Sequence, residues 1–204
     1  MDQFRVGGAS RPLHLPPFCI YFNNLWFNEK ATGPAFVLLR ETMMDILVVC
    51  TGNICRSPMA EGLLRHMLPA TMWPGLRVHS AGTHGLDGEP AAPFAVQTAA
   101  AMGIDITGHR ACSLNPEMVR QADLILVMEP FHREIINRVL PPADADRVRL
   151  LADFENPRQS DTIDDPYNRS RKVYAACLRR IQRCLAGVVR HLSTTRRIDP
   201  RGSS

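Results

Sequence analysis

The sequence predicts an α/β fold, a single doubly wound domain with a four-stranded parallel sheet flanked by helices on both faces. Three observations lead to this prediction. From residue 45 onward, short apolar runs alternate with segments whose apolar residues recur at helical spacing. The run at 124–128 is continuously apolar, as a strand buried on both faces is. The chain has 204 residues, of which 45% are hydrophobic, and this is enough for one sizeable core.

The expected elements follow one another in chain order. Strands are predicted at 46–49, 76–80, 124–128 and 148–151. Helices are predicted at 58–68, 91–102, 116–121, 130–139 and 172–192. Gly103 ends the second helix, and an irregular acidic segment precedes the last one. Because ligands bind such sheets at the carboxyl ends of the strands, the residues that follow each strand are the first candidates for a site.

The connection between the first strand and the first helix reads Cys-Thr-Gly-Asn-Ile-Cys-Arg-Ser-Pro over residues 50–58. Cys50 ends the strand, and Gly52 and Asn53 tolerate the unusual backbone angles of a tight loop. The backbone N–H groups of the loop and the Arg56 guanidinium would then surround one small volume, which suits a tetrahedral oxyanion. The cysteine is expected beside that volume as a nucleophile.

The start of the first helix is marked by three residues. Ser57 is the expected N-cap, Pro58 suits the first helical position, and Glu61 falls in the first turn. The positive end of the helix dipole then points into the loop. Together with Arg56 it favours the thiolate form of Cys50 near neutral pH. The same Cys-x5-Arg spacing recurs twice inside the last predicted helix, where the N–H groups cannot turn toward an anion.

The composition excludes several classes of protein. The net charge of +4 comes almost entirely from arginine, and basic residues never run beyond adjacent pairs, so nucleic acid binding is not expected. No apolar run approaches about 20 residues, so membrane insertion is not expected. No cluster of His, Cys and carboxylates has metal-ligand spacing, so no metal or other cofactor is expected. Six cysteines in such a chain do not form a disulfide scaffold, and a thiolate enzyme favours the reducing cytoplasm.

The two ends of the chain differ from the domain, which is expected to span 44–193. Residues 1–43 hold five of the eight Phe residues without a clean period. They are interpreted as a translated leader before a start at Met43 or Met44, as a poorly ordered extension, or as an aromatic docking segment. The polar tail 194–204 is expected to be disordered.

A second motif, Asp164-Asp165-Pro166-Tyr167, lies just before the last predicted helix. Expelling an aryl or alkyl oxygen from phosphorus needs a proton donor. Asp165 is the candidate donor and Asp164 is the next in line. Pro166 restricts the backbone at Asp165, and Tyr167 offers an aromatic wall for a planar substrate. Taken alone, this motif equally fits a solvated acidic turn.

Together, the two motifs resemble those of the low molecular weight protein tyrosine phosphatases. The resemblance covers about residues 45–192. It extends to Ser80-Ala81-Gly82, Gly108-His109, Asp123-Leu124-Ile125-Leu126 and, for the bacterial branch of the family, Asp165-Pro166-Tyr167-Asn168-Arg169-Ser170. It implies hydrolysis of phosphotyrosine in proteins without a cofactor. Bacterial members typically act on autophosphorylated tyrosine kinases that control capsule or exopolysaccharide assembly, so such a kinase is the expected partner.

The resemblance also implies the roles of the site residues. Cys50 attacks phosphorus and becomes phosphocysteine, Arg56 stabilises the developing charge, and Asp165 protonates the leaving oxygen and then activates water. The other loop residues expected to contact substrate are Thr51, Gly52, Asn53, Ile54, Cys55 and Ser57. The Ser57 hydroxyl would hydrogen-bond the thiolate. His109 would brace Asn53, or would be an ordinary loop histidine.

Four residues are singled out by their positions. Leu86 and Tyr167 are the expected rim of the substrate cleft, although Leu86 equally fits a loop residue that covers the core. In this family the second loop thiol, here Cys55, can form a reversible disulfide with the nucleophile. The alternative for Cys55 is a buried packing role. Cys112 stands where relatives often carry arginine, so the salt bridge of that arginine is either absent or supplied by Arg110.

Two other functions remain as alternatives. An arsenate reductase of the same fold needs two more cysteines to relay a disulfide outward, and residues 113–150 contain none. A non-catalytic phosphotyrosine-binding module would carry a damaged nucleophile, arginine or acid, and Cys50, Arg56 and Asp165 are all present. The sequence therefore favours an active phosphatase over both alternatives.

Overall fold

The computed structural model describes residues 44–198, and the structural statements below concern that part of the chain. Its elements occur in the order β1 (Met44–Cys50), α2 (Arg56–Met67), β2 (Leu76–Gly82), α3 (Pro93–Ala100), α4 (Pro116–Gln121), β3 (Leu124–Val127), α5 (Pro130–Asn137), η1 (Pro142–Arg147), β4 (Val148–Leu150), η2 (Leu151–Phe154) and α6 (Arg171–Ile198). Strands and helices thus alternate as the sequence predicts.

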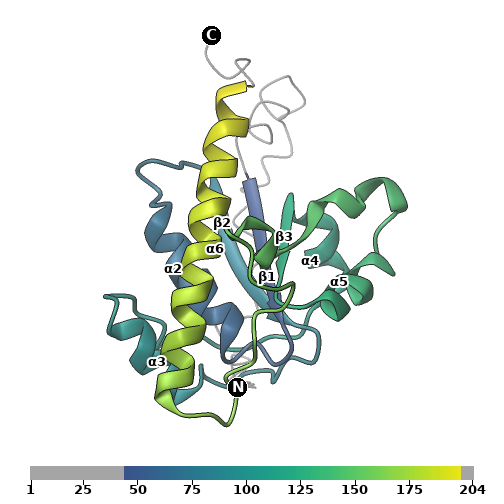
Figure 1. Ribbon diagram of the computed structural model, residues 1–204. Helices are drawn as coiled ribbons and strands as arrows, with labels where there is room; N and C mark the ends of the chain where they lie inside the picture. The colour runs from purple at the N-terminus through teal and green to yellow at the C-terminus, as the bar shows by residue number, and fades with distance from the viewer. Residues whose placement is uncertain (1–43, 199–204) are drawn as a thin grey trace, which may run out of the picture. The chain divides into compact units, whose positions relative to one another are not determined.

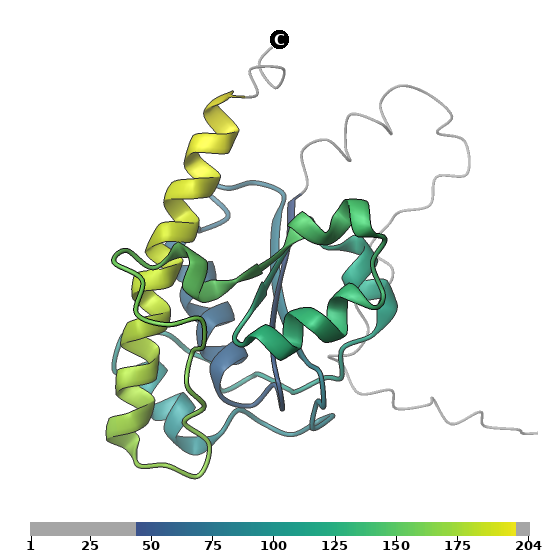
Figure 2. The same ribbon diagram turned by 45° about the vertical axis from the view of Figure 1, so that its right-hand side comes forward.

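The four strands form one parallel sheet in the order β2-β1-β3-β4. Helices α2, α3 and α6 cover one face of the sheet, and α4 and α5 cover the other, as Figure 1 and the turned view in Figure 2 show. The predicted doubly wound α/β fold is therefore confirmed.

Side chains of the central strand β1 alternate between two hydrophobic cores. Ile46, Val48 and Cys50 face the core beneath α2, α3 and α6, whereas Leu47 and Val49 face the core shared with α4 and α5. A strand buried on both faces requires this continuous apolar run. Burial of β1 on both faces fixes the position of Cys50 at the carboxyl end of the strand.

The first helix begins earlier than predicted. Helix α2 starts at Arg56 with Cys55 at the N-cap, so the prediction that Ser57 caps the helix is wrong. The Ser57 hydroxyl instead lies 3.0 Å from Cys50 Sγ and accepts a hydrogen bond of 2.8 Å from Asn53 Nδ2. These tertiary partners occupy the oxygen that a local cap would use.

The last helix is longer than predicted. Helix α6 continues to Ile198, so the prediction of a disordered tail is wrong for its first five residues. The hydroxyls of Thr194 and Thr195 donate to backbone carbonyls one turn earlier, which lets these polar residues continue the helix. Residues 199–204 and the predicted extension 1–43 lie outside the described residues.

Helix α3 is shorter than predicted, because Pro93 takes its first position and the chain turns after Ala100. None of the helices in the described part of the chain combines the length and apolarity that crossing a membrane requires.

Candidate active site

The loop between β1 and α2 lies at the carboxyl end of the sheet. Cys50 is the last residue of β1 and is 2% exposed. Its Sγ lies 3.0 Å from the Ser57 hydroxyl, on the first turn of α2. The start of a helix therefore faces the thiol, and the backbone N–H groups of this turn have no partner within the helix.

Asn53 holds the loop in shape. Its φ of 56° is in the left-handed region, which Asn adopts more readily than most residues. Its Nδ2 donates to the hydroxyls of Ser57 and Ser80 at 2.8 Å each, and its Oδ1 accepts from the backbone N–H of Cys112 at 2.9 Å. His109 Nε2 donates to the Asn53 carbonyl at 2.7 Å. The side chain of this fully buried Asn53 thus links three segments of the chain.

His109, Glu61 and Cys112 surround this network. Burial lowers the pKa of His109, so its neutral ring braces the Asn53 carbonyl. Glu61 accepts from the Ser80 hydroxyl at 2.6 Å, outside the first helical turn where the sequence placed it. Cys112 Sγ lies 3.3 Å from the Ser80 carbonyl, so Cys112 packs against the network.

The contacts of Arg110 show whether it supplies the salt bridge of the arginine that relatives often carry at the position of Cys112. Arg110 donates to the backbone carbonyls of Thr107 and His109. Within residues 44–195 it forms no ion pair, so the salt bridge considered for this region is absent there.

Gly82 at the end of β2 allows the second strand to approach the loop. A Cβ at this position would lie 2.4 Å from the Thr51 carbonyl oxygen and 2.9 Å from Gly85 Cα. Both neighbours are backbone atoms that cannot rotate away, so this position requires glycine.

Arg56 connects the loop to two distant carboxylates. Its guanidinium is 1% exposed, with Nη1 at 2.5 Å from Glu129 Oε1 and Nη2 at 2.5 Å from Asp165 Oδ2. Nη1 also donates to the Ile163 carbonyl at 2.9 Å. Burial alone would lower the pKa of Arg56, but Cys50, Asp165 and Glu129 outweigh it and the pKa is raised. The guanidinium is therefore a permanent cation in a fixed orientation.

Asp165 lies at the mouth of the site. Its side chain is 43% exposed, and its Oδ1 accepts from the Tyr167 backbone N–H at 3.1 Å. This contact and the Arg56 ion pair hold the carboxyl group beside the loop. Asp164, the other candidate acid, is exposed and forms no side-chain hydrogen bond among the described residues.

Two residues after β3 belong to the site and were not predicted. Glu129 fixes one side of the Arg56 guanidinium, as described above. His132 is fully buried on α5, with Nε2 at 3.1 Å from the Thr51 hydroxyl. Burial, followed by the charges of Arg56 and His84, lowers the pKa of His132 to about 3. The imidazole is therefore neutral, and it supports the loop through its contact with the Thr51 hydroxyl.

Cys55 is buried and turned toward α6. Its Sγ lies 3.2 Å from the Tyr174 hydroxyl, and burial raises the pKa of the Cys55 thiol to about 11. Cys50 and Cys55 are both free thiols. Their predicted disulfide thus stays a prediction.

Leu86 and Tyr167, the two residues predicted to form the rim of the substrate cleft, are both exposed. Leu86 is 45% exposed, and its side chain lies within 4 Å of the position that a Cβ on Gly52 would take. Tyr167 is 52% exposed on the loop after Asp165. Ile54 is half-buried and packs against the core beneath α2.

This arrangement brings a thiol, a helix start, a buried guanidinium and a carboxylic acid to one edge of the sheet. Within residues 44–195 no group of three His, Cys, Asp or Glu side chains could hold a metal ion. The groups present suit nucleophilic displacement on a tetrahedral oxyanion.

The low molecular weight phosphotyrosine protein phosphatase family matches residues 45–197, which is most of the chain. The chain therefore belongs to this family of protein-tyrosine-phosphatases, as its fold and site indicate.

Bacterial proteins are among its relatives. The probable low molecular weight protein-tyrosine-phosphatase EpsP of Ralstonia solanacearum is 46% identical over 138 residues, which cover 68% of this chain and 88% of EpsP. Wzb of Escherichia coli K12 is 39% identical over 139 residues, which cover 68% of this chain and 88% of Wzb.

Solved structures of phosphatases are also similar to this chain. The tyrosine phosphatase amsI of Erwinia amylovora is 34% identical with a TM-score of 0.65, covering 73% of this chain and 93% of amsI. The YwlE arginine phosphatase of Geobacillus stearothermophilus is 30% identical with a TM-score of 0.67, covering 76% of this chain and 97% of YwlE.

Proposed function

We propose that this phosphatase hydrolyses phosphotyrosine in proteins through a phosphocysteine intermediate on Cys50. The observation that carries the proposal is the convergence of three groups at one edge of the sheet. The Cys50 thiol lies against the helix start at Ser57, and the buried Arg56 guanidinium, seven residues into the motif, reaches Asp165 from the far end of the domain.

In the first step, the Cys50 thiolate attacks phosphorus and the bond between phosphorus and the tyrosine oxygen breaks. Arg56 and the loop N–H groups bind the equatorial oxygens, where negative charge develops. A phosphate dianion on Arg56 would displace Asp165 from the guanidinium. Released from the guanidinium and placed beside the phosphate dianion, the Asp165 carboxylate would take up a proton from solvent and donate it to the departing phenolate oxygen.

In the second step, water attacks the phosphocysteine. Asp165 takes one proton from the water, the bond between sulfur and phosphorus breaks, and inorganic phosphate leaves. The Ser57 hydroxyl at 3.0 Å from Cys50 Sγ stabilises the thiolate that is released. Asn53, braced by His109, keeps the loop in the conformation that both steps need.

We further propose that the substrate is a bacterial tyrosine autokinase of exopolysaccharide or capsule assembly, in the cytoplasm. The bacterial features of the sequence and the bacterial relatives EpsP and Wzb support this proposal. The free Cys50 and Cys55 thiols suit a reducing compartment. The genes that neighbour this one would test the partner most directly, because a kinase gene of this type is expected among them.

Arsenate reduction is less well supported by the geometry. Cys177 and Cys184, the cysteines that could extend a relay, are both buried on α6. Burial raises their pKa values to about 12 and about 11, which is unfavourable for relaying a disulfide to the surface.

Hydrolysis of p-nitrophenyl phosphate near pH 6 tests the proposed activity, with Cys50→Ser as the control. Turnover by the unmodified protein and none by the variant is the expected result. Absence of turnover in both would leave a binding module as the better description. Phosphotyrosine should be preferred over phosphoarginine, on which YwlE is named to act.

A further inference from the structure

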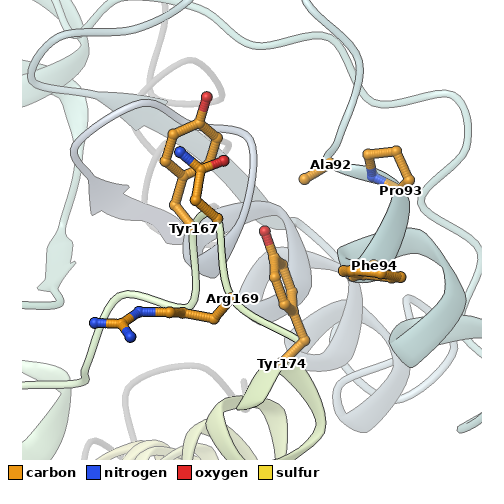
Figure 3. Close-up of a pocket in the computed structure, with 7 residues that line it drawn as sticks. Ala92, Pro93, Phe94, Tyr167, Arg169 and Tyr174 are labelled. Carbon is orange, nitrogen blue, oxygen red and sulfur yellow. The ribbon is translucent and has the colours of Figure 1, made fainter. Parts of the chain in front are cut away.

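A hollow of about 400 Å³ lies between the start of α3 and the loop before α6 (Figure 3). Ala92, Pro93 and Phe94 form one side, and Tyr167 and Tyr174 form the other. Tyr167 is already part of the proposed substrate rim. The rest of the hollow has no part in the chemistry described above.

Both sides of the hollow are bonded directly to the phosphate-binding loop. The Ala92 backbone N–H donates to the Ile54 carbonyl at 2.8 Å. The Tyr174 hydroxyl lies 3.2 Å from Cys55 Sγ. The hollow therefore lies next to the loop. Two or three residues of extended substrate chain span roughly 7–10 Å, at about 3.3 Å each, so residues close to a bound phosphotyrosine would reach it.

The lining exposes aromatic surface to solvent. Phe94 is 39% exposed and Tyr167 is 52% exposed. Phe94 packs edge-on against the buried Tyr174, with ring centroids 5.8 Å apart and planes at 67°. Exposed aromatic side chains that share one concave surface are typical of binding sites for apolar groups.

The outer edge of the hollow carries one basic side chain, and two more basic residues follow it in the chain. Arg169 lines it, and Figure 3 shows its guanidinium pointing away from Phe94. Arg169, Arg171 and Lys172 are all exposed, and within residues 44–195 they form no ion pair. On the same helix, by contrast, Arg180 and Arg183 are paired with the buried Glu155. The unpaired cations would attract negative charge on a bound chain.

We propose that this hollow is a side-chain subsite for the phosphotyrosine protein, and that it takes a leucine or larger apolar residue close to the phosphotyrosine in a segment that also carries acidic residues. The proposal rests on the proposed function, because the phosphotyrosine itself places the substrate chain beside the hollow. The occupant is a segment of the substrate, since the hollow is continuous with the rim at Tyr167 and its edge complements acidic residues.

The test uses the full chain and a set of phosphotyrosine peptides. Leu, Gly, Glu or Lys is placed in turn at each of about three positions on either side of the phosphotyrosine. At one position or more, Leu should raise kcat/KM about tenfold over Gly, the gain expected from burying that side chain. Glu should be preferred over Lys by about threefold at low salt, and added salt should weaken this preference.

Two pairs of variants assign the preferences to the hollow. Phe94→Ala should reduce the ratio for Leu over Gly to about twofold or less. Val139→Ala is the matched control, because Val139 is also 39% exposed but lies outside the hollow, and it should keep the ratio. Arg169→Glu should reverse the preference for Glu over Lys, whereas Arg179→Glu, further along α6, should keep it. Circular dichroism checks that each variant is folded. If Phe94→Ala does not fold, Arg169→Glu and its control Arg179→Glu still test the hollow.

The outcomes separate this proposal from the proposed function. If the protein hydrolyses p-nitrophenyl phosphate and all peptides equally, the subsite is rejected and the phosphatase function stands. A preference for Leu that survives Phe94→Ala also rejects the hollow as its origin. Association of the protein into a dimer that Phe94→Ala abolishes would assign the hollow to a second copy and overturn the proposal. If no phosphate ester is hydrolysed, the proposed function itself fails.

Discussion

Asp165 Oδ2 lies 2.5 Å from Arg56 Nη2, so the proposed acid and the proposed phosphate ligand form an ion pair across the mouth of the site. The two residues are 109 positions apart in the chain. A phosphate group that binds Arg56 must compete with this carboxylate. Substrate binding and release of the acid are thus linked through one guanidinium.

Replacing Asp165 tests the acid step. Asp165→Ala should reduce kcat about 10²–10⁴-fold with phenyl phosphate, whose leaving group needs a proton. The loss should be smaller for formation of the phosphoenzyme from p-nitrophenyl phosphate, because p-nitrophenolate leaves without one. Stopped-flow and steady-state assays measure both values. Asp164→Asn is the control, and a larger effect there would transfer the acid role to Asp164.

Glu129 is expected to keep Arg56 in its catalytic orientation. Glu129→Gln removes one charged partner of the guanidinium and should reduce kcat/KM roughly 10- to 100-fold, the equivalent of one charge-assisted hydrogen bond. Glu117→Gln, which breaks the exposed pair with Arg120, should change kcat/KM less than about twofold. Equal activity in both variants would show that Asp165 and the Ile163 carbonyl suffice to hold Arg56.

His132 should make stability depend on pH. Its folded pKa of about 3 lies below the value of about 6.5 in the unfolded chain. Below pH 6.5 the unfolded chain therefore takes up a proton that the folded protein does not, and the free energy of unfolding falls as pH falls toward 3.

His132→Asn removes this contribution of His132. Between pH 7 and pH 5 the free energy of unfolding should therefore fall by roughly 2 kcal/mol less in the variant than in the parent. Urea unfolding at several pH values measures the difference. Parallel pH profiles for the two proteins would contradict the buried, neutral state of His132.

Cys55 should protect the nucleophile from overoxidation. Peroxide converts the Cys50 thiolate to sulfenic acid, and the Cys55 thiol then displaces water to form a disulfide. Because Cys55 Sγ contacts Tyr174, the thiol must leave this partner first. Peroxide-treated protein should regain activity with dithiothreitol, and Cys55→Ser should not. Cys184→Ser, at another buried cysteine, is the control, and full recovery by Cys55→Ser would reject the disulfide.

The fold could be predicted because its signals are local. The run at 46–49 is apolar at every position, and this predicts a strand buried on both faces, as the structure has it. Boundaries were less predictable. Ser57 has the chemistry of an N-cap, but its hydroxyl is used by Cys50 and Asn53, and this choice depends on how the loop folds back. The polar residues after 193 likewise led to a predicted disordered tail, although α6 continues to Ile198.

The site residues also fall into those that the sequence predicts and those that it does not. The loop residues from Cys50 to Arg56 are adjacent in the chain, so their spacing placed them together. Glu129 and His132 reach the loop only because β3 pairs with β1 in the sheet, an order that the sequence does not state. One signal could have found them. Both follow the carboxyl end of the most apolar predicted strand, where polar residues enter sites of this fold.

Trapping the phosphoenzyme tests the central claim most directly. Asp165→Ala lacks the base that activates water, so it should accumulate phosphocysteine when mixed with p-nitrophenyl phosphate. Rapid denaturation followed by mass spectrometry should find the mass of one phosphoryl group on the peptide that contains Cys50, and none on Cys50→Ser. Turnover without any phosphoenzyme, or a phosphoryl group on another residue, would contradict nucleophilic catalysis by Cys50.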